Sequence, residues 1–247
     1  GYAMKILLSG YNGVMGHVVS ELTSDIVAGY SNVLADASFP VYTDLSEIKE
    51  DFDVILDFSH PSALKDILNK AVSVKKPLVI AATGLDEGHH QMIDLASSHI
   101  PVLQSGNFSL GINAMLDITT ALSKMLEGYD VEIIEKHHNL KVDAPSGTAE
   151  MLLGSVLEAS DDRDHAVYGR HGNDAKRTAS EVGVHAVRGG TIVGEHSVIF
   201  AGVDEVIEIK HTAFSKKIFA QGALKACEFM VSAKAGRYEM KDVLNHD

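Results

Sequence analysis

The segment of residues 135–149, EKHHNLKVDAPSGTA, combines groups that can hold an anion with groups that can donate a proton. It contains two adjacent histidines, His137 and His138, and two lysines, Lys136 and Lys141. It ends in Ser146-Gly147-Thr148, where we expect a helix to begin, and the unpaired N–H groups and dipole of a helix N-terminus favour negative charge. Imidazole and ammonium groups also donate protons. The segment therefore predicts a site for a small carboxylate substrate with a proton donor beside it.

Two questions about this segment stay open at the level of sequence. His137 and Lys141 are both suited to deliver the proton, and we treat them as a coupled pair because the sequence does not choose between them. Adjacent histidines can also ligate a metal ion. No carboxylate or cysteine lies at helical ligand spacing from them, so we predict no metal site.

A second pattern places Gly10, Gly13 and Gly16 between an expected strand and an expected helix, in SGYNGVMG. Glycine lets the backbone turn tightly, approach a pyrophosphate and pack the helix on the sheet. Asp36 falls 20 residues past Gly16, at the expected end of the second strand, where a carboxylate can accept hydrogen bonds from ribose hydroxyls. These residues predict a dinucleotide site. Ala37 follows Asp36 where an arginine would bind a 2′-phosphate, which favours NADH over NADPH.

Three later strand ends are expected at the same edge of the sheet, where ligands of open α/β sheets bind. The third strand ends in Asp57-Phe58-Ser59-His60, and the fourth in Ala81-Ala82-Thr83-Gly84. Small residues and hydroxyls there suit a nicotinamide and its ribose. The fifth strand ends in Ser105-Gly106-Asn107-Phe108, which can serve the cofactor, a hinge between domains or both.

The elements that must position these groups begin with alternating short apolar runs and helical patterns. The expected strands are residues 4–9, 32–36, 53–58, 77–81 and 101–104, and the helices are 14–25, 62–74 and 86–98. Continuous Val/Ile/Leu runs between helices indicate parallel strands buried on both faces. Right-handed crossovers then give a Rossmann-like, doubly wound sheet.

The pattern changes near Asn107 to that of an α+β domain with a mainly antiparallel sheet. The expected helices are 110–126 and 148–158, and the strands are 130–135, 181–187, 191–200 and 205–212, with a polar excursion at 161–180. Arg188-Gly189-Gly190 is expected as a tight turn between two of these strands. A last helix at 215–234 is expected to return to the first domain. We therefore predict domains at 4–107, joined by 215–247, and at 108–214.

Composition excludes several classes of protein. The 247 residues carry a formal net charge of −13, which argues against binding nucleic acid or an anionic membrane. One cysteine rules out an internal disulfide and suits the cytoplasm. No apolar run of membrane-spanning length and no signal peptide are found.

From residue 4 to residue 244 the chain resembles the 4-hydroxy-tetrahydrodipicolinate reductase (dihydrodipicolinate reductase) family. The resemblance is carried by GYNGVMG, DFSHP, AATGLDE, GNFSLGIN, EKHHNLKVDAPSGTA, VRGGTIVGEH and YEMKDVL. It implies hydride transfer from NAD(P)H to a cyclic imine or diene dicarboxylate in diaminopimelate and lysine biosynthesis. It also implies a homotetramer whose C-terminal domains associate through their sheets.

The resemblance assigns roles to individual positions. It implies that His137 is the catalytic proton donor or acceptor, that Lys141 is a second proton donor, and that His138 binds substrate. Gly147 and Thr148 would bind a substrate carboxylate, and from the residues themselves we add Ser146. The implied cofactor site, with Phe58 and Ser59 added from their strand end, is Gly10, Tyr11, Asn12, Gly13, Val14, Met15, Asp36, Ala81, Ala82, Thr83, Ser105, Gly106, Asn107 and Phe108.

The chain departs from the common family pattern on the cofactor side. Val14 stands where many members have arginine, Ala81-Ala82-Thr83 where many have Gly-Thr-Thr, and the segment at 37–51 is shorter. These differences concern coenzyme preference rather than the reaction. Two other classes stay open: a two-domain dehydrogenase of amino-acid-like substrates, which would not need the 135–149 string, and a silent NAD-sensing protein, which would be expected to lose it.

Overall fold

The computed structural model describes residues 3–245, and the chain forms two compact units. One unit contains the chain up to Leu110 and from Lys216 onward, and the other is Gly111–Ser215. Residues 246 and 247 of the predicted returning segment lie outside the described range. None of the helices in residues 3–245 has the length and apolar character needed to span a bilayer. The roles predicted for the two domains stay predictions.

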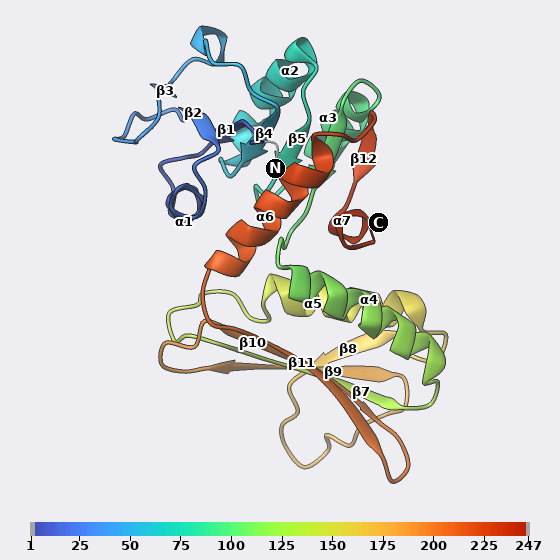
Figure 1. Ribbon diagram of the computed structural model, residues 1–247. Coiled ribbons are helices and arrows are strands. Elements are labelled where there is room, and N and C mark those ends of the chain that lie inside the picture. The colour runs from blue at the N-terminus through green and yellow to red at the C-terminus, as the bar shows by residue number, and fades with distance from the viewer. Residues whose placement is uncertain (1–2, 246–247) are drawn as a thin grey trace. The chain divides into compact units, whose positions relative to one another are not determined.

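The first unit is built on a seven-stranded parallel sheet in the order β12-β6-β5-β4-β1-β2-β3, with helices on both sides (Figure 1). Its strands are β1 (Ile6–Ser9), β2 (Ile26–Tyr30), β3 (Val41–Tyr42), β4 (Val54–Asp57), β5 (Leu78–Ile80), β6 (Pro101–Gln104) and β12 (Gly236–Tyr238). Its helices are α1 (Val14–Leu22), α2 (Leu64–Val74), α3 (Glu87–Ser97), α6 (Lys217–Met230) and α7 (Met240–Leu244).

Both faces of this sheet are buried. Ile6 and Leu8 of β1 belong to a core completed by Val19 of α1 and Ala223 of α6. Leu7, between them, belongs to a second core formed with α2 and α3. Successive side chains of a strand point to opposite faces, so a strand buried on both sides is a continuous apolar run. The predicted Rossmann-like fold class is confirmed.

The second strand, however, is not where we predicted it. Residues 32–36 form no strand, and the partner of β1 is β2, Ile26–Tyr30. Val33 and Leu34, whose apolar character suggested the strand, are each 60% exposed. Gly29 lowers the apparent strand propensity of β2. It is needed there because a Cβ would lie 2.7 Å from the Phe39 ring and 2.8 Å from the Tyr11 ring.

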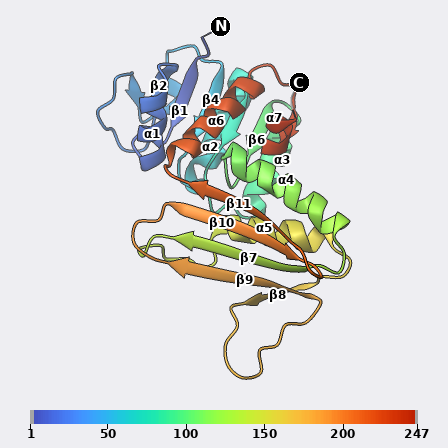
Figure 2. The ribbon, with the colours of Figure 1, turned by 60° about the horizontal axis from the view of Figure 1, so that its bottom comes forward.

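The second unit places two helices against one face of a five-stranded sheet in the order β11-β10-β7-β9-β8 (Figure 2). The helices are α4 (Leu110–Met125) and α5 (Gly147–Ala159). The strands are β7 (Asp130–His137), β8 (His165–Tyr168), β9 (Glu181–Arg188), β10 (Gly194–Ala201) and β11 (Val206–Ala213). Val131 and Ile133 of β7 are buried against these helices. Because strand side chains alternate, Glu135 and His137 point to the same face.

This sheet is mixed rather than a chain of hairpins. β10 pairs antiparallel with β7 and β11, whereas β9 pairs parallel with β7 and β8. The predicted hairpin through Arg188-Gly189-Gly190 is therefore wrong, because β7 lies between β9 and β10. A parallel pair needs a crossover, and α5 with β8 supplies one between β7 and β9.

Candidate active site

The glycine loop of the first unit brings backbone segments closer than any side chain would allow. Gly10 has φ +78°, and a Cβ there would lie 2.8 Å from the backbone carbon of Phe58. A Cβ on Gly16 would lie 2.5 Å from the carbonyl oxygens of both Gly10 and Tyr11. Gly13 is the N-cap residue of α1, and no described side chain caps that end. The first turn of α1 is thus available to an anion such as a phosphate.

A cleft of about 920 Å³ opens over this loop, entirely within the first unit. Its walls are the glycine loop and the segments after β4 and β5, as expected for the carboxyl edge of a parallel sheet. The predicted cofactor residues that line it are Gly10, Gly13, Val14, Met15, Phe58, Ser59, Ala81, Ala82 and Thr83. His60, Gly84 and His89 also line the cleft and were not predicted as site residues.

Three predicted cofactor residues lie beside this cleft rather than in its lining. Tyr11 is buried, and its hydroxyl accepts a hydrogen bond from Ala35 N at 2.9 Å. Asn12 donates from Nδ2 to Val33 O at 3.4 Å. Asp36 is exposed and follows this tethered segment, six residues beyond the end of β2. The prediction that Asp36 ends a strand is wrong, but Tyr11 and Asn12 fix its segment to the glycine loop.

The segment after β6 also stands outside the lining of the cleft. Ser105 N donates to Ile80 O at 3.3 Å, which places it next to the end of β5. Its hydroxyl donates to Asn107 O at 2.7 Å, so it holds a local turn. Asn107 and Phe108 are buried, and Gly106 is exposed. Contact of these four residues with a cofactor stays a prediction.

In the second unit, His137 is the last residue of β7 and lies in a cluster of charged and polar groups. Its Nδ1 contacts Oε2 of Glu135, a side chain with no exposed surface. Oε1 of Glu135 forms an ion pair with Nη1 of Arg188 at 2.7 Å. Burial lowers the pKa of His137, Glu135 opposes this shift, and the cations of Lys141 and Arg188 add to it. The imidazole is therefore held between one carboxylate and two cations.

His196 of β10 connects this cluster to the start of α5. Its ring packs edge-on against that of His137, with centroids 5.1 Å apart. Its Nε2 lies 2.8 Å from Oγ of Ser146, which accepts a hydrogen bond from Ala149 N as the N-cap of α5. Burial lowers the pKa of His196 to about 3, so the ring is neutral near pH 7. The buried Ser146 hydroxyl thus supports the helix end, and its predicted contact with substrate stays a prediction.

The loop after β7 carries the other predicted substrate residues. Lys141 Nζ lies 2.8 Å from Oδ1 of Asp143, and this ion pair lowers the pKa of Asp143. Nδ1 of His138 accepts a hydrogen bond from Leu140 N at 3.2 Å. Gly147, the first residue of α5, is exposed, and a Cβ there would meet nothing within 4 Å. The loop thus offers a cation, an imidazole and an exposed helix start, and these are the groups that bind a small carboxylate.

Three members of this cluster, Glu135, Arg188 and His196, were not predicted as site residues. Arg188 was assigned to a turn, but it is the last residue of β9 and pairs with Glu135. Glu135 could have been found from sequence, because it stands two residues before His137 on an expected strand and so shares its face. No local signal places Arg188 or His196 beside them, since each comes from a different strand.

Glu135, His137 and His196 also present three possible ligand atoms within 4.8 Å of one another. The Arg188 guanidinium, 2.7 Å from the same carboxylate, already compensates its charge and opposes a second cation. We expect dialysis against a chelator to leave the activity unchanged, as measured by turnover before and after metal removal. Activity lost with the chelator and restored by Zn²⁺ would contradict this prediction and identify the cluster as a metal site.

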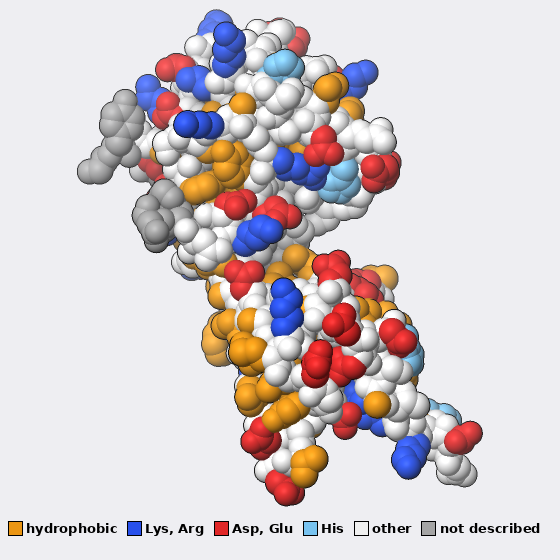
Figure 3. All heavy atoms as spheres, turned by 90° about the vertical axis from the view of Figure 1, so that its right-hand side faces the viewer, with side chains coloured by type: hydrophobic (Ala, Val, Ile, Leu, Met, Phe, Trp, Pro, Cys, Tyr) orange, Lys and Arg blue, Asp and Glu red, His pale blue; other side chains and the backbone are white. Residues whose placement is uncertain are grey.

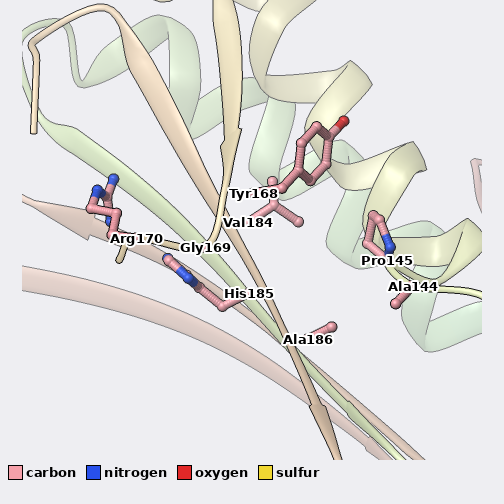
Figure 4. A pocket seen from close by; sticks show the side chains of 8 residues that line it. All are labelled: Ala144, Pro145, Tyr168, Gly169, Arg170, Val184, His185 and Ala186. Atoms are coloured by element: carbon pink, nitrogen blue, oxygen red, sulfur yellow. The ribbon is translucent and has the colours of Figure 1, made fainter. Parts of the chain in front are cut away.

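A hollow of about 560 Å³ in the second unit lies between Pro145 and the strands β8 and β9 (Figure 4). None of the predicted site residues lines it. Its cation, Arg170, is engaged with Glu181 at 2.8 Å and with Glu132. Because this guanidinium is compensated, the hollow is less suited to an anionic substrate than the His137 cluster.

Comparison with known proteins covers nearly the whole chain. The N-terminal domain of dihydrodipicolinate reductase matches residues 4–108, and its C-terminal domain matches residues 111–244. A 4-hydroxy-tetrahydrodipicolinate reductase of Caldanaerobacter subterraneus is 45% identical over 98% of both chains. One of Exiguobacterium sibiricum is 46% identical over 99% of this chain and 98% of the relative.

Solved structures agree on the fold. A dipicolinate-bound dihydrodipicolinate reductase from Paenisporosarcina sp. TG-14 superposes with a TM-score of 0.80 at 19% identity, over 96% of this chain and 98% of that one. The DAP dehydrogenase of C. glutamicum in complex with DAP superposes less well, with a TM-score of 0.58 at 15% identity, over 99% and 96%. At these identities the likeness concerns architecture alone. From the family domains and the sequence relatives, the chain belongs to the dihydrodipicolinate reductase family.

Proposed function

We propose that this chain reduces a cyclic dicarboxylate imine, 4-hydroxy-tetrahydrodipicolinate or dihydrodipicolinate, to tetrahydrodipicolinate with NADH or NADPH and a proton. From the 4-hydroxy compound, the hydroxyl group leaves as water. The reaction belongs to diaminopimelate and lysine biosynthesis, the pathway that the family resemblance implies. The observation that carries the proposal is the cluster at the end of β7, where His137 stands among the charges of Glu135, Arg188 and Lys141. A proton donor between cations fits a substrate that carries two carboxylates and must gain a proton.

In this proposal the residues of the second unit bind the anion and move the proton. The exposed Gly147 and the half-buried Thr148 receive one carboxylate at the N-terminus of α5. Lys141 exchanges its ion pair with Asp143 for one with the substrate, and His138 adds a further polar contact. His137 and Lys141 act as a coupled pair that supplies the proton. Removing the substrate from water strengthens each of these charge interactions.

The cleft of the first unit suits the coenzyme because it is bordered by the start of α1, which no described side chain caps, and by Gly13, which presents no side chain. Gly10, Gly13 and the first turn of α1 would hold the pyrophosphate, and Ala81 to Thr83 would accept the nicotinamide end. A bound nicotinamide supplies the hydride. Asp36, tethered beside the glycine loop, would bind the adenosine ribose and favour NADH.

A coupled spectrophotometric assay tests the proposal. A synthase makes the unstable substrate from pyruvate and aspartate semialdehyde, and oxidation of NADH or NADPH is followed at matched concentrations. We expect rapid oxidation that depends on the synthase. Absence of oxidation with either coenzyme, by folded protein that binds the coenzyme, would contradict the proposal and favour another imine or carbonyl substrate.

Replacing Asp36 by alanine is expected to lower the ratio of kcat/KM for NADH to that for NADPH by about tenfold. The loss of one or two hydrogen bonds to ribose, and of repulsion towards a 2′-phosphate, accounts for that size. The ratio is measured in the coupled assay. Asp51→Ala, which removes the same charge from an exposed position of the same unit, is the control and should leave the ratio unchanged. An unchanged ratio in Asp36→Ala would remove Asp36 from the site.

A homotetramer assembled through the sheets of the second units is also part of the proposal. The sheet face opposite α4 and α5 carries the half-buried Ile134 and Ile199 and the exposed Val206. Figure 3, seen from the right-hand side of Figure 1, shows hydrophobic side chains among acidic ones in its lower part, without identifying the sheet face. Exposed apolar area of this kind favours association. Sedimentation equilibrium should give the mass of four chains, and a monomer would contradict it.

Two further parts of the proposal concern the location of the protein in the cell and the partners that it binds. A cytoplasmic location is consistent with a single cysteine, the buried Cys227. The net charge of −13 supports a small-molecule enzyme without affinity for nucleic acid or anionic membranes.

A further inference from the structure

We infer that Glu135 is a positioning residue for His137: its buried carboxylate, anchored on its other side by Arg188, holds Nδ1 of the ring and leaves Nε2 to exchange the proton with substrate. The inference rests on the proposed function, because it deepens the role of His137 in that reaction. It concerns a carboxylate that need not touch the substrate.

The geometry of β7 brings the two side chains together. Glu135 and His137 are two residues apart on one strand, so both point to the face covered by α4 and α5. The Glu135 side chain has no exposed surface, and its Oε2 contacts Nδ1 of His137. Its Oε1 lies 2.7 Å from Nη1 of Arg188. A buried carboxylate stays ionised at low cost only when such partners compensate it.

An ionised carboxylate accepts hydrogen bonds but cannot donate one, and this determines which nitrogen of His137 carries the proton. In the neutral ring Nδ1–H donates to Glu135, so Nε2 is the free basic nitrogen. In the charged ring Nε2–H becomes the transferable proton. A Cβ on Gly194 would lie 3.1 Å from Nε2, so a glycine at that position leaves room beside this nitrogen. The His196 ring, with its centroid 5.1 Å away, limits rotation of the imidazole.

Among the groups described around the His137 ring, Glu135 favours the protonated form of the imidazole. Burial lowers the pKa of His137, and the cations Lys141, from the loop, and Arg188, from β9, lower it further. His196 from β10 is neutral near pH 7 because burial lowers its pKa to about 3. Among the described groups that shift the pKa of His137, the one that raises it is Glu135. Without its negative charge, less imidazolium would be present at a given pH.

Arg188 also connects the two predicted proton donors. Its Nη1 pairs with Glu135, and its Nη2 donates to the backbone oxygen of Asp143 at 2.9 Å. Asp143 in turn pairs with Lys141. One guanidinium therefore links the carboxylate behind His137 to the loop that carries Lys141.

The test is Glu135→Gln, which keeps the shape of the side chain and removes its charge. We expect kcat to fall by about 10- to 100-fold, part of the 10²–10⁴ that general acid–base catalysis supplies, with the KM for substrate and the Kd for NADH nearly unchanged. The alkaline limb of the pH profile should move to lower pH, since the imidazolium loses its partner. The matched control is Glu132→Gln, on the same strand and paired with Arg170 on the opposite face. It should leave the pH profile unchanged.

A double-mutant cycle separates positioning from general damage. In a His137→Gln background, Glu135→Gln should cause little further loss, because its effect passes through the ring. An equal loss in both backgrounds, or an unshifted pH profile in Glu135→Gln, would overturn the inference.

A measurement without turnover keeps the inference testable if Glu135→Gln fails to fold or if the proposed reaction is wrong. Histidine labelled with ¹⁵N is observed by NMR in the unaltered protein, and the His137 signals are assigned by their loss in His137→Gln. We expect neutral His137 to carry its proton on Nδ1, with that proton shifted downfield by the carboxylate. A neutral ring protonated on Nε2 would overturn the inference, whatever the substrate proves to be.

Discussion

Replacing both His137 and Lys141 by alanine is expected to lower kcat by about 10⁴-fold or more while the Kd for NADH stays nearly unchanged. Each donor is worth about 10²–10⁴ in general acid–base catalysis, and the pair acts on the same proton. Lys141 is also the cation closest in sequence to the proposed carboxylate site at Gly147. The cleft proposed for the coenzyme lies in the other unit and is lined by neither side chain, so nucleotide binding should persist.

The single variants and one control make this experiment decisive. Turnover is measured in the coupled assay, and NADH affinity by fluorescence titration. Lys136→Ala removes a neighbouring cation whose partner is Glu195, 3.5 Å away on the opposite sheet face, and should retain turnover. If His137→Ala alone reproduced the double variant and Lys141→Ala did not, His137 would be the decisive donor. Loss of NADH affinity in the double variant would contradict the assignment of this loop to substrate.

The features that could be predicted from sequence are those encoded by neighbouring residues. The glycine loop could be predicted because only glycine permits the close backbone approaches found at Gly10 and Gly16. The carboxyl ends of β4 and β5 were expected to meet because parallel strands end at one edge, and Ser59 and Thr83 do line one cleft. These are consequences of local pattern and general topology.

The second strand was predicted at the wrong place because two apolar runs lie close together in the sequence. Residues 26–30 and 32–36 both contain strand-forming residues, and Gly29 makes the true strand look weaker. A glycine is needed at position 29 because a Cβ there would collide with the rings of Tyr11 and Phe39. Neither ring is near Gly29 in sequence, so this need could not be predicted. Moving the strand also moves Asp36 away from a strand end, to an exposed segment tethered through Tyr11.

The cluster around His137 in the second unit could also be predicted only in part from sequence. His137 could be selected from the 135–149 string alone, and Glu135 could have been selected by strand alternation. Arg188 and His196 join them only because β7 lies between β9 and β10. That strand order depends on a crossover through α5, which a hairpin interpretation of Gly189-Gly190 excluded.

Gly16→Ala is expected to destabilise the first unit by about 2–3 kcal/mol and to weaken NADH binding at least about tenfold. A Cβ there would lie 2.5 Å from the carbonyl oxygens of Gly10 and Tyr11, so the loop or α1 must move. At this chain length the loss corresponds to a Tm lower by roughly 5–10 °C. Scanning calorimetry gives the Tm, and fluorescence titration gives the Kd for NADH.

Gly13→Ala is the matched comparison, because the two glycines lie in one loop but differ in their surroundings. A Cβ on Gly13 would approach Gly10 O only to 3.6 Å, and its φ of −82° suits alanine. Its Tm should therefore stay close to that of the unaltered protein, and any loss of NADH affinity would report how closely the coenzyme approaches the loop. Equal destabilisation by both substitutions would contradict the steric argument. An unchanged NADH affinity in Gly16→Ala, with the Tm lowered, would instead show that the coenzyme does not depend on this loop.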